Sequence, residues 1–226
     1  VLFGVQSVYM KDGELTGMYY DYALAAPMMA AQPDGVCDVL ILGMGTGTYA
    51  KQCMEYFGDM GISTEGVEID RKITALSREY FDLPESVNVT EYDGRAFLNV
   101  SDKLYDVIMV DAYQDITIPF QLSSAEFFAL VREHLKQGGV MVVNMNMRSK
   151  EAGGINDYLS DTIASQFSEV YTVDVAGSTN RELFASNDEG MMYCFMERTG
   201  QPEYRELYPM MSRVNDGLIE YAAGDR

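Results

Sequence analysis

The 226-residue sequence contains no tryptophan, one histidine and three cysteines. Cys37, Cys53 and Cys194 are too few and too widely spaced for a disulfide framework or a zinc motif, so we expect core thiols, no metal site and a reducing, cytoplasmic compartment. No apolar run is long enough to cross a bilayer, and no signal peptide opens the chain. Val1 falls inside an expected strand, which suggests that the protein begins upstream.

Basic residues are also scarce: 16 lysines and arginines stand against 35 acidic residues, for a formal net charge of −19. Phosphate binding requires a basic surface, so nucleic acid is a poor partner for this chain. A small cationic substrate would instead be attracted by the acidic field. Acidity that serves only solubility is the alternative.

Apolar strand patterns alternate with helical patterns along most of the chain, and this predicts a doubly wound α/β fold with a mostly parallel, Rossmann-like sheet. We expect an N-terminal strand and helix with a β-hairpin remnant (1–30), a nucleoside-binding domain (31–200) and a helical surface tail (201–226). The expected strands are 1–10, 38–42, the stretch ending at 70, 87–92, 105–110, 140–144, 170–175 and 191–196. The main expected helices are 19–29, 49–57, 123–137 and 155–167.

A turn with three glycines at alternate positions follows the first buried strand. Gly43, Gly45 and Gly47 let the chain turn tightly and let a ligand approach bare backbone at the start of the next helix. The next strand ends near Glu68, where an acid can accept hydrogen bonds from ribose hydroxyls. No lysine follows the glycines, which disfavours a Walker-type nucleotide site. The pattern therefore predicts a nucleoside site.

Four carboxylates follow the ends of three consecutive strands: Glu68, Asp70, Asp93 and Asp111. Ligands of parallel sheets bind at this edge, so we expect the acids to converge beside the glycine turn. Asp70 is expected to cap a helix. Glu68 would bind ribose, Asp93 the amine of adenine, and Asp111 would lie nearest the reacting end. His134, in the last turn of a helix expected to start with a capping box of Ser123 and Glu126, is predicted to be structural.

With these residues identified, the chain resembles the polyamine aminopropyltransferase (spermidine synthase) family, in particular its divergent branch that is often fused to membrane domains. The resemblance covers roughly residues 1–147 and depends on Gly4–Ser7, Tyr19–Asp21, Leu40–Thr48, Gly66–Asp70, Asp93–Leu98, Val110–Tyr113 and 127–140. It implies a fold similar to class I methyltransferases, a donor such as decarboxylated S-adenosylmethionine, no metal and a polyamine substrate. It is also compatible with a homodimer and with a membrane domain outside this chain.

The resemblance also implies roles for individual residues. Asp111 would be the base that accepts the proton of the attacking amine, with Tyr113 and Asp115 beside it. Tyr19, Asp21 and Gln114 would contact the amine substrate. The donor would contact Gln6, Gly43, Gly45, Thr46, Gly47, Glu68, Ile69, Asp93 and Gly94.

Several positions depart from the family pattern. The glycine loop has Thr46 where the family usually has an acid that holds the donor's amine, and Gln114 stands where a second acid is usual. The helix near residue 20 carries Asp21 and Ala25 in place of a glutamate and a histidine. Two alternatives to aminopropyl transfer therefore stay open. They are methyl transfer from S-adenosylmethionine, which Thr46 permits, and a non-catalytic domain that senses an adenosine ligand for a membrane partner.

Overall fold

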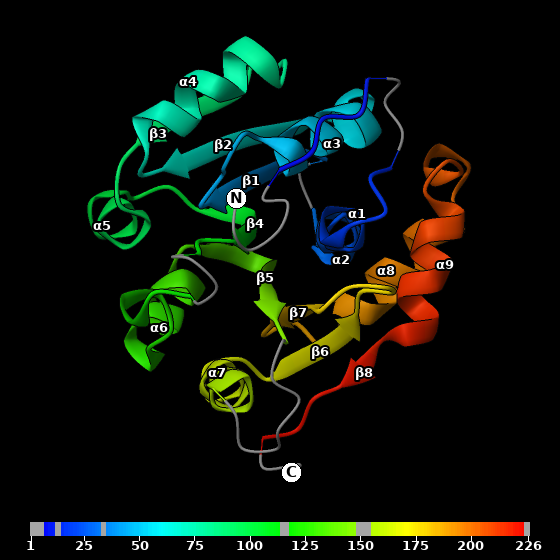
Figure 1. Cartoon of the computed structure of the whole chain (residues 1–226). Helices are drawn as coiled ribbons and strands as arrows, with labels where there is room; N and C mark the ends of the chain where they lie inside the picture. Colours follow the sequence, from blue (N-terminus) through cyan, green and yellow to red (C-terminus); the bar gives the residue numbers. More distant parts are fainter. Residues whose placement is uncertain (1–6, 12–14, 33–34, 114–117, 148–154, 224–226) are drawn as a thin grey trace.

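The computed structural model describes residues 7–11, 15–32, 35–113, 118–147 and 155–223. These residues form one eight-stranded sheet with the order β3-β2-β1-β4-β5-β7-β6-β8 (Figure 1). Strands β1 to β5 are parallel, and β7 runs antiparallel to both β5 and β6. The strand order reverses between β1 and β4, which confirms the expected doubly wound, mostly parallel fold. The strands are β1 (Cys37–Leu42), β2 (Ile62–Glu68), β3 (Asn88–Glu91), β4 (Tyr105–Val110), β5 (Leu135–Asn146), β6 (Glu169–Asp174), β7 (Asn180–Ser186) and β8 (Ile219–Glu220).

Helices cover both faces of this sheet (Figure 1). One face carries α1 (Tyr19–Ala23), α2 (Ala25–Met29), α3 (Thr48–Phe57), α8 (Met191–Thr199) and α9 (Tyr208–Gly217). The other carries α5 (Gly94–Val100), α6 (Ala125–Glu133) and α7 (Ile155–Ala164), while α4 (Arg71–Tyr80) lies beside β2 and β3. Short 3-10 turns occur at Gly58–Met60, Phe120–Leu122 and Pro202–Tyr204. Each face of the sheet therefore has its own apolar core.

The last third of the chain differs from the prediction. The expected strand 191–196 is instead helix α8, in which Met191 and Phe195 are buried one turn apart. A short apolar run fits a helix or a strand equally well by sequence alone. Strand β7 was not among the expected strands, because its first three residues are polar, although Glu182 among them is buried. The expected surface helix of the tail also buries apolar side chains, including Met210 and Met211 of α9.

The predicted helix over 19–29 is two short helices that meet at Leu24. Pro27 has no N–H to donate to the carbonyl of Ala23, and the Tyr49 hydroxyl donates to that carbonyl instead, at 3.1 Å. The three tyrosines of α1 are all buried. No strand forms in residues 7–10 of the expected N-terminal strand, and its first six residues lie outside the described part of the chain.

Helix α6 begins at Ala125, two residues after the expected start. Its cap is Ser124 rather than Ser123, and the Ser124 hydroxyl accepts from the Phe127 N–H at 3.3 Å. It ends at Glu133, and β5 begins at Leu135, so the predicted extension to residue 137 is wrong. His134 is buried between the carbonyls of Leu130 and Ser101, at 2.9 Å from each, which confirms its structural role.

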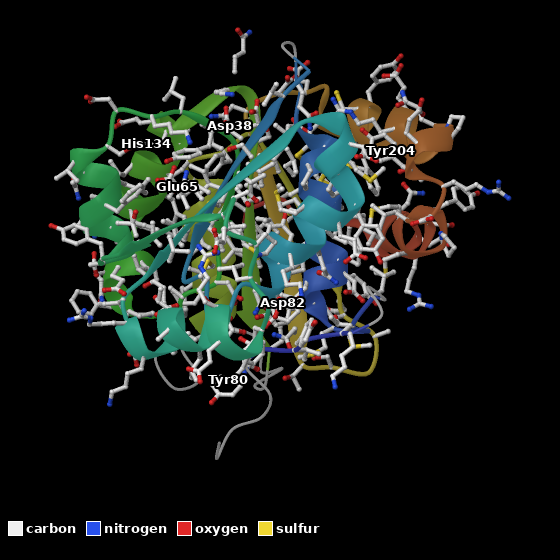
Figure 2. All side chains as sticks on the ribbon, turned by 90° about the horizontal axis from the view of Figure 1, so that it is seen from above. Asp38, Glu65, Tyr80, Asp82, His134 and Tyr204 are labelled. Atoms are coloured by element: carbon white, nitrogen blue, oxygen red, sulfur yellow. The ribbon has the colours of Figure 1, made fainter. Side chains whose placement is uncertain are left out.

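Ion pairs hold the end of the sheet at which the parallel strands begin. Lys136 Nζ lies 2.7 Å from Asp38 and 2.8 Å from Asp106. Burial acts to lower the pKa of Lys136, but these two carboxylates together outweigh it and raise the pKa above the ordinary range. Figure 2 shows Asp38, Glu65 and His134 gathered at this end and Asp82 at the opposite one. The edge at which the strands end remains available for a ligand site.

Candidate active site

The glycine turn lies against the residues that follow β4. Gly43 has a φ of 83°, and a Cβ there would lie 2.7 Å from the Asp111 carbonyl oxygen. Only glycine fits this position without strain, because both the backbone conformation and the space exclude a side chain. The turn therefore brings β1 and β4 together at the point where the strand order reverses.

Glu68 holds the glycine turn. Its side chain is buried and accepts hydrogen bonds from the N–H groups of Gly45 at 2.9 Å and Asp70 at 3.0 Å. Gly45 has a φ of 58°, which favours glycine, and a Cβ there would lie 3.3 Å from the Ser7 hydroxyl oxygen. Glu68, at the end of β2, therefore lies against the backbone of the glycine turn, as expected.

Residues just after the N-terminus lie over this turn. The Ser7 hydroxyl accepts from the Thr46 N–H at 3.4 Å, and Val8 exchanges two hydrogen bonds with the Thr48 hydroxyl at 2.8 and 3.2 Å. The Thr46 hydroxyl itself is buried and has no partner among the described residues. Gln6, predicted to contact the donor, lies outside the described residues.

Asp111 follows β4 and is only partly exposed. Its carboxylate accepts from the Tyr19 hydroxyl at 2.6 Å and from the Asn144 amide at 2.8 Å. Burial raises the pKa of Asp111 to about 7, against these two hydrogen bonds, and the charge of Glu68 adds to the increase. Burial also raises the pKa of Tyr19 well above 10, so its hydroxyl stays a donor. Asp111 can therefore exchange a proton near neutral pH.

Tyr113 lies two residues further on and donates from its hydroxyl to the Asn144 carbonyl at 2.6 Å. This bond ties the segment after β4 to β5. Gln114 and Asp115, predicted to act beside Asp111, lie outside the described residues, so their roles stay predictions.

Asp70 and Asp93 each cap a helix. Asp70 accepts from the Lys72 N–H at 2.9 Å, as predicted, and Asp93 accepts from the Ala96 N–H at 2.8 Å. Of the four strand-end acids, Glu68 and Asp111 are therefore the two that do not serve as caps. Gly94 begins α5 directly after Asp93, and Ile69 projects into solvent with 71% of its surface exposed. Adenine binding by Asp93 stays a prediction.

Asp21 is fully surrounded by protein donors. Its carboxylate accepts from Thr16, from the Gly17 N–H at 2.6 Å and from the Gln52 amide at 2.7 Å. These bonds fix the start of α1 and hence the position of Tyr19. The contact of Asp21 with substrate stays a prediction.

Two residues near Asp111 were not in the predicted site. Asn144 ends an expected parallel strand, and a polar residue at that position was the signal that could have identified it. Glu182 lies next to Asn144 on β7, which the sequence did not reveal as a strand.

Similarity to known proteins agrees with this geometry. A family model described as a spermine/spermidine synthase domain matches residues 19–176. The chain belongs to this family. A probable polyamine aminopropyl transferase of Bifidobacterium longum is 65% identical over 187 residues, which cover 82% of this chain and 41% of that protein.

Two solved structures share the fold of this spermine/spermidine synthase family member. A probable spermidine synthase from Corynebacterium glutamicum aligns with a TM-score of 0.67 at 20% identity, over 92% of this chain and 79% of its own. Human methyltransferase-like protein 13, in complex with SAH, gives a TM-score of 0.68 at 19% identity over 92% and 96%. These two likenesses establish a class I methyltransferase-like fold.

The chain spans 41–60% of the length of three curated relatives that it matches. Among the described residues, no helix combines the length and apolarity needed to span a membrane. The same part of the chain holds no cluster of three or more histidine, cysteine or acidic side chains suited to a metal ion.

Proposed function

We propose that this chain transfers an aminopropyl group from decarboxylated S-adenosylmethionine to a diamine such as putrescine. The observation that carries the proposal is the environment of Asp111, a largely buried carboxylate whose pKa is raised to about 7. It lies beside a glycine turn held by Glu68, which is the arrangement expected for the adenosine part of the donor. The names of the relatives, polyamine aminopropyl transferase and spermidine synthase, support the same reaction.

The reaction requires a neutral amine, because an ammonium nitrogen has no free electron pair. The nitrogen attacks the aminopropyl carbon attached to the sulfonium, the C–N bond forms, and the C–S electrons go to sulfur to give methylthioadenosine. The proton that the nitrogen loses goes to Asp111. Proton transfer from a primary ammonium of pKa ~10.4 to a carboxylate is unfavourable. The raised pKa of Asp111, about 7 instead of 3.8, makes this transfer less unfavourable by about 4 kcal/mol.

The position of Tyr19 and Asn144 supports this role for Asp111. Their hydrogen bonds occupy one carboxylate oxygen each and fix its orientation. Each oxygen keeps a second acceptor site for an amine proton. Tyr19 comes from α1 and Asn144 from β5, so the base is held by rigid elements.

Binding and turnover assays test the proposal. By calorimetry, decarboxylated S-adenosylmethionine should bind at least tenfold tighter than S-adenosylmethionine, a difference of about 1.4 kcal/mol. Asp111→Asn should lower aminopropyl transfer by about 10²–10⁴-fold while methylthioadenosine still binds. Asp102→Asn, at an exposed carboxyl ahead of β4, is the matched control and should retain full activity.

The same assays separate the alternatives. Equal or reversed donor preference, with methyl transfer to an acceptor, would replace this proposal with a methyltransferase. The observation that favours this second function is the buried Thr46 hydroxyl in the glycine turn, which has no hydrogen-bond partner among the described residues. Tight methylthioadenosine binding without turnover of either donor would favour a sensing domain. An active Asp111→Asn variant would exclude Asp111 as the base.

A further inference from the structure

Glu182, in the middle of β7, is completely buried, and neither of its carboxyl oxygens has a hydrogen-bond partner among the described residues. Burial raises its pKa well above the usual 4.5, and the charge of Asp111 adds to the increase. Burial therefore favours the neutral acid at Glu182 over the carboxylate. An apolar side chain would fill this position at lower free-energy cost, so the carboxyl group calls for a functional explanation.

Glu182 belongs to a row of polar side chains across three neighbouring strands. It pairs directly with Asn144, so both side chains lie on the same face of the sheet. Val110 pairs with Val143, which places the next residue, Asp111, level with Asn144. Two strand spacings separate the Asp111 and Glu182 backbones by about 10 Å. The row thus runs from the partly exposed Asp111 inward to the buried Glu182. Helix α1 contacts β5 and β7, the strands that carry Asn144 and Glu182.

The groups that interact electrostatically with Glu182 are acids and phenols. They are Asp111, Tyr49 on α3 and Tyr113. The neighbouring Arg181 instead pairs with Asp174 at 2.7 Å, and adjacent residues of a strand point to opposite faces. The Asn144 amide is also engaged, since its nitrogen donates to Asp111 and its oxygen accepts from Asn180. No positive charge is thus among the groups that act on Glu182 in the described part of the chain.

We infer that Glu182 is a second anionic anchor of the amine site, which holds the ammonium group of a diamine at the end distant from Asp111. This assignment rests on the proposed function and names a specificity-determining residue for it. The three N–H donors of an ammonium can satisfy both Glu182 oxygens. When the dication binds, Glu182 gives its proton to solvent and becomes the carboxylate of an ion pair. In this assignment Glu182 is the residue that distinguishes an aliphatic diamine from a monoamine.

Calorimetry with two amines tests the assignment. Methylthioadenosine-loaded protein is titrated with 1,4-diaminobutane and with butylamine, in two buffers of different ionisation enthalpy. Glu182→Gln should weaken 1,4-diaminobutane at least tenfold and release about one proton fewer per diamine bound than the wild type. Butylamine should bind both proteins equally, because its single charge is held at Asp111. Glu182→Asp, which keeps the charge on a shorter chain, should recover part of the affinity and the proton release.

Each result has a distinct meaning. Equal weakening of both amines would show that Glu182 is only structural, and unchanged diamine affinity and proton release would show that it does not contact the amine. Both would overturn the assignment and leave the proposed function intact. A wild-type protein that binds methylthioadenosine and no diamine would overturn the proposed function and this assignment together. Unchanged methylthioadenosine affinity in each variant confirms that the protein is folded.

Discussion

Replacing Glu182 with methionine should make the protein more stable. The side chain is fully buried, its two oxygens lack partners among the described residues, and methionine has a similar length without a polar group. An unsatisfied buried polar group costs about 1–3 kcal/mol. The variant should gain this amount wherever the acid is neutral in both the folded and the unfolded chain. In a protein of this size the gain corresponds to a rise in Tm of about 2–4 °C per kcal/mol.

The gain should grow with pH. Because the pKa of Glu182 is raised on folding, its contribution to wild-type stability is complete below about pH 4.5 and is lost as pH rises toward the folded-state pKa. In that window the unfolded chain ionises Glu182 and the folded chain does not. The wild type therefore loses about 1.4 kcal/mol per pH unit relative to the variant.

Urea denaturation at several pH values from about 4.5 upward measures this difference, provided that the m-values agree. Glu182→Gln is the matched control: it cannot ionise but keeps an unpartnered polar group. It should therefore cancel the pH dependence without the gain that methionine brings. A pH-independent difference between wild type and the methionine variant, or a less stable variant, would refute the argument that Glu182 is neutral and unpartnered.

Three further predictions concern the site. Tyr19→Phe removes a hydrogen bond that lowers the pKa of Asp111, so the pH at which kcat/KM reaches half its plateau should move upward from about 7; an unchanged profile would contradict the role of Tyr19. Gly43→Ala should destabilise the protein by about 2–5 kcal/mol in thermal or urea unfolding, because it combines left-handed strain with a backbone clash; a loss below 1 kcal/mol would contradict the close approach. Asp93→Ala and Asp70→Ala should each lower the free energy of unfolding by about 1 kcal/mol, because each removes a helix cap. If Asp93 also holds adenine, only Asp93→Ala should weaken methylthioadenosine binding in calorimetry.

Local patterns in the sequence were sufficient for the glycine turn and for the acids that follow the first parallel strands. The glycines after β1 and the acid after β2 predicted a site that the structure assembles, with Glu68 bonded to Gly45. Asp70 capped α4 as expected. A glycine turn and a helix cap each depend on a few neighbouring residues, so their residue types can be recognised in the sequence.

Tertiary packing decided what local pattern could not. An apolar run of six residues became the start of α8, in which Met191 and Phe195 are buried. Strand β7 formed between β5 and β6 although its first three residues are polar. Asp111, Asn144 and Glu182 are more than 30 residues apart in the chain and become neighbours only through the pairing of β4, β5 and β7.

The sequence by itself therefore determined the alternating fold, the glycine turn and the presence of acids at the strand ends. Only the tertiary structure decided how far these acids lie from water and which donors reach them. The pKa of a carboxyl group depends on that burial and on those donors, and neither is fixed by the residues beside it in the chain. For this reason the base-like pKa of Asp111 and the neutral, buried Glu182 emerge from the fold and not from any motif.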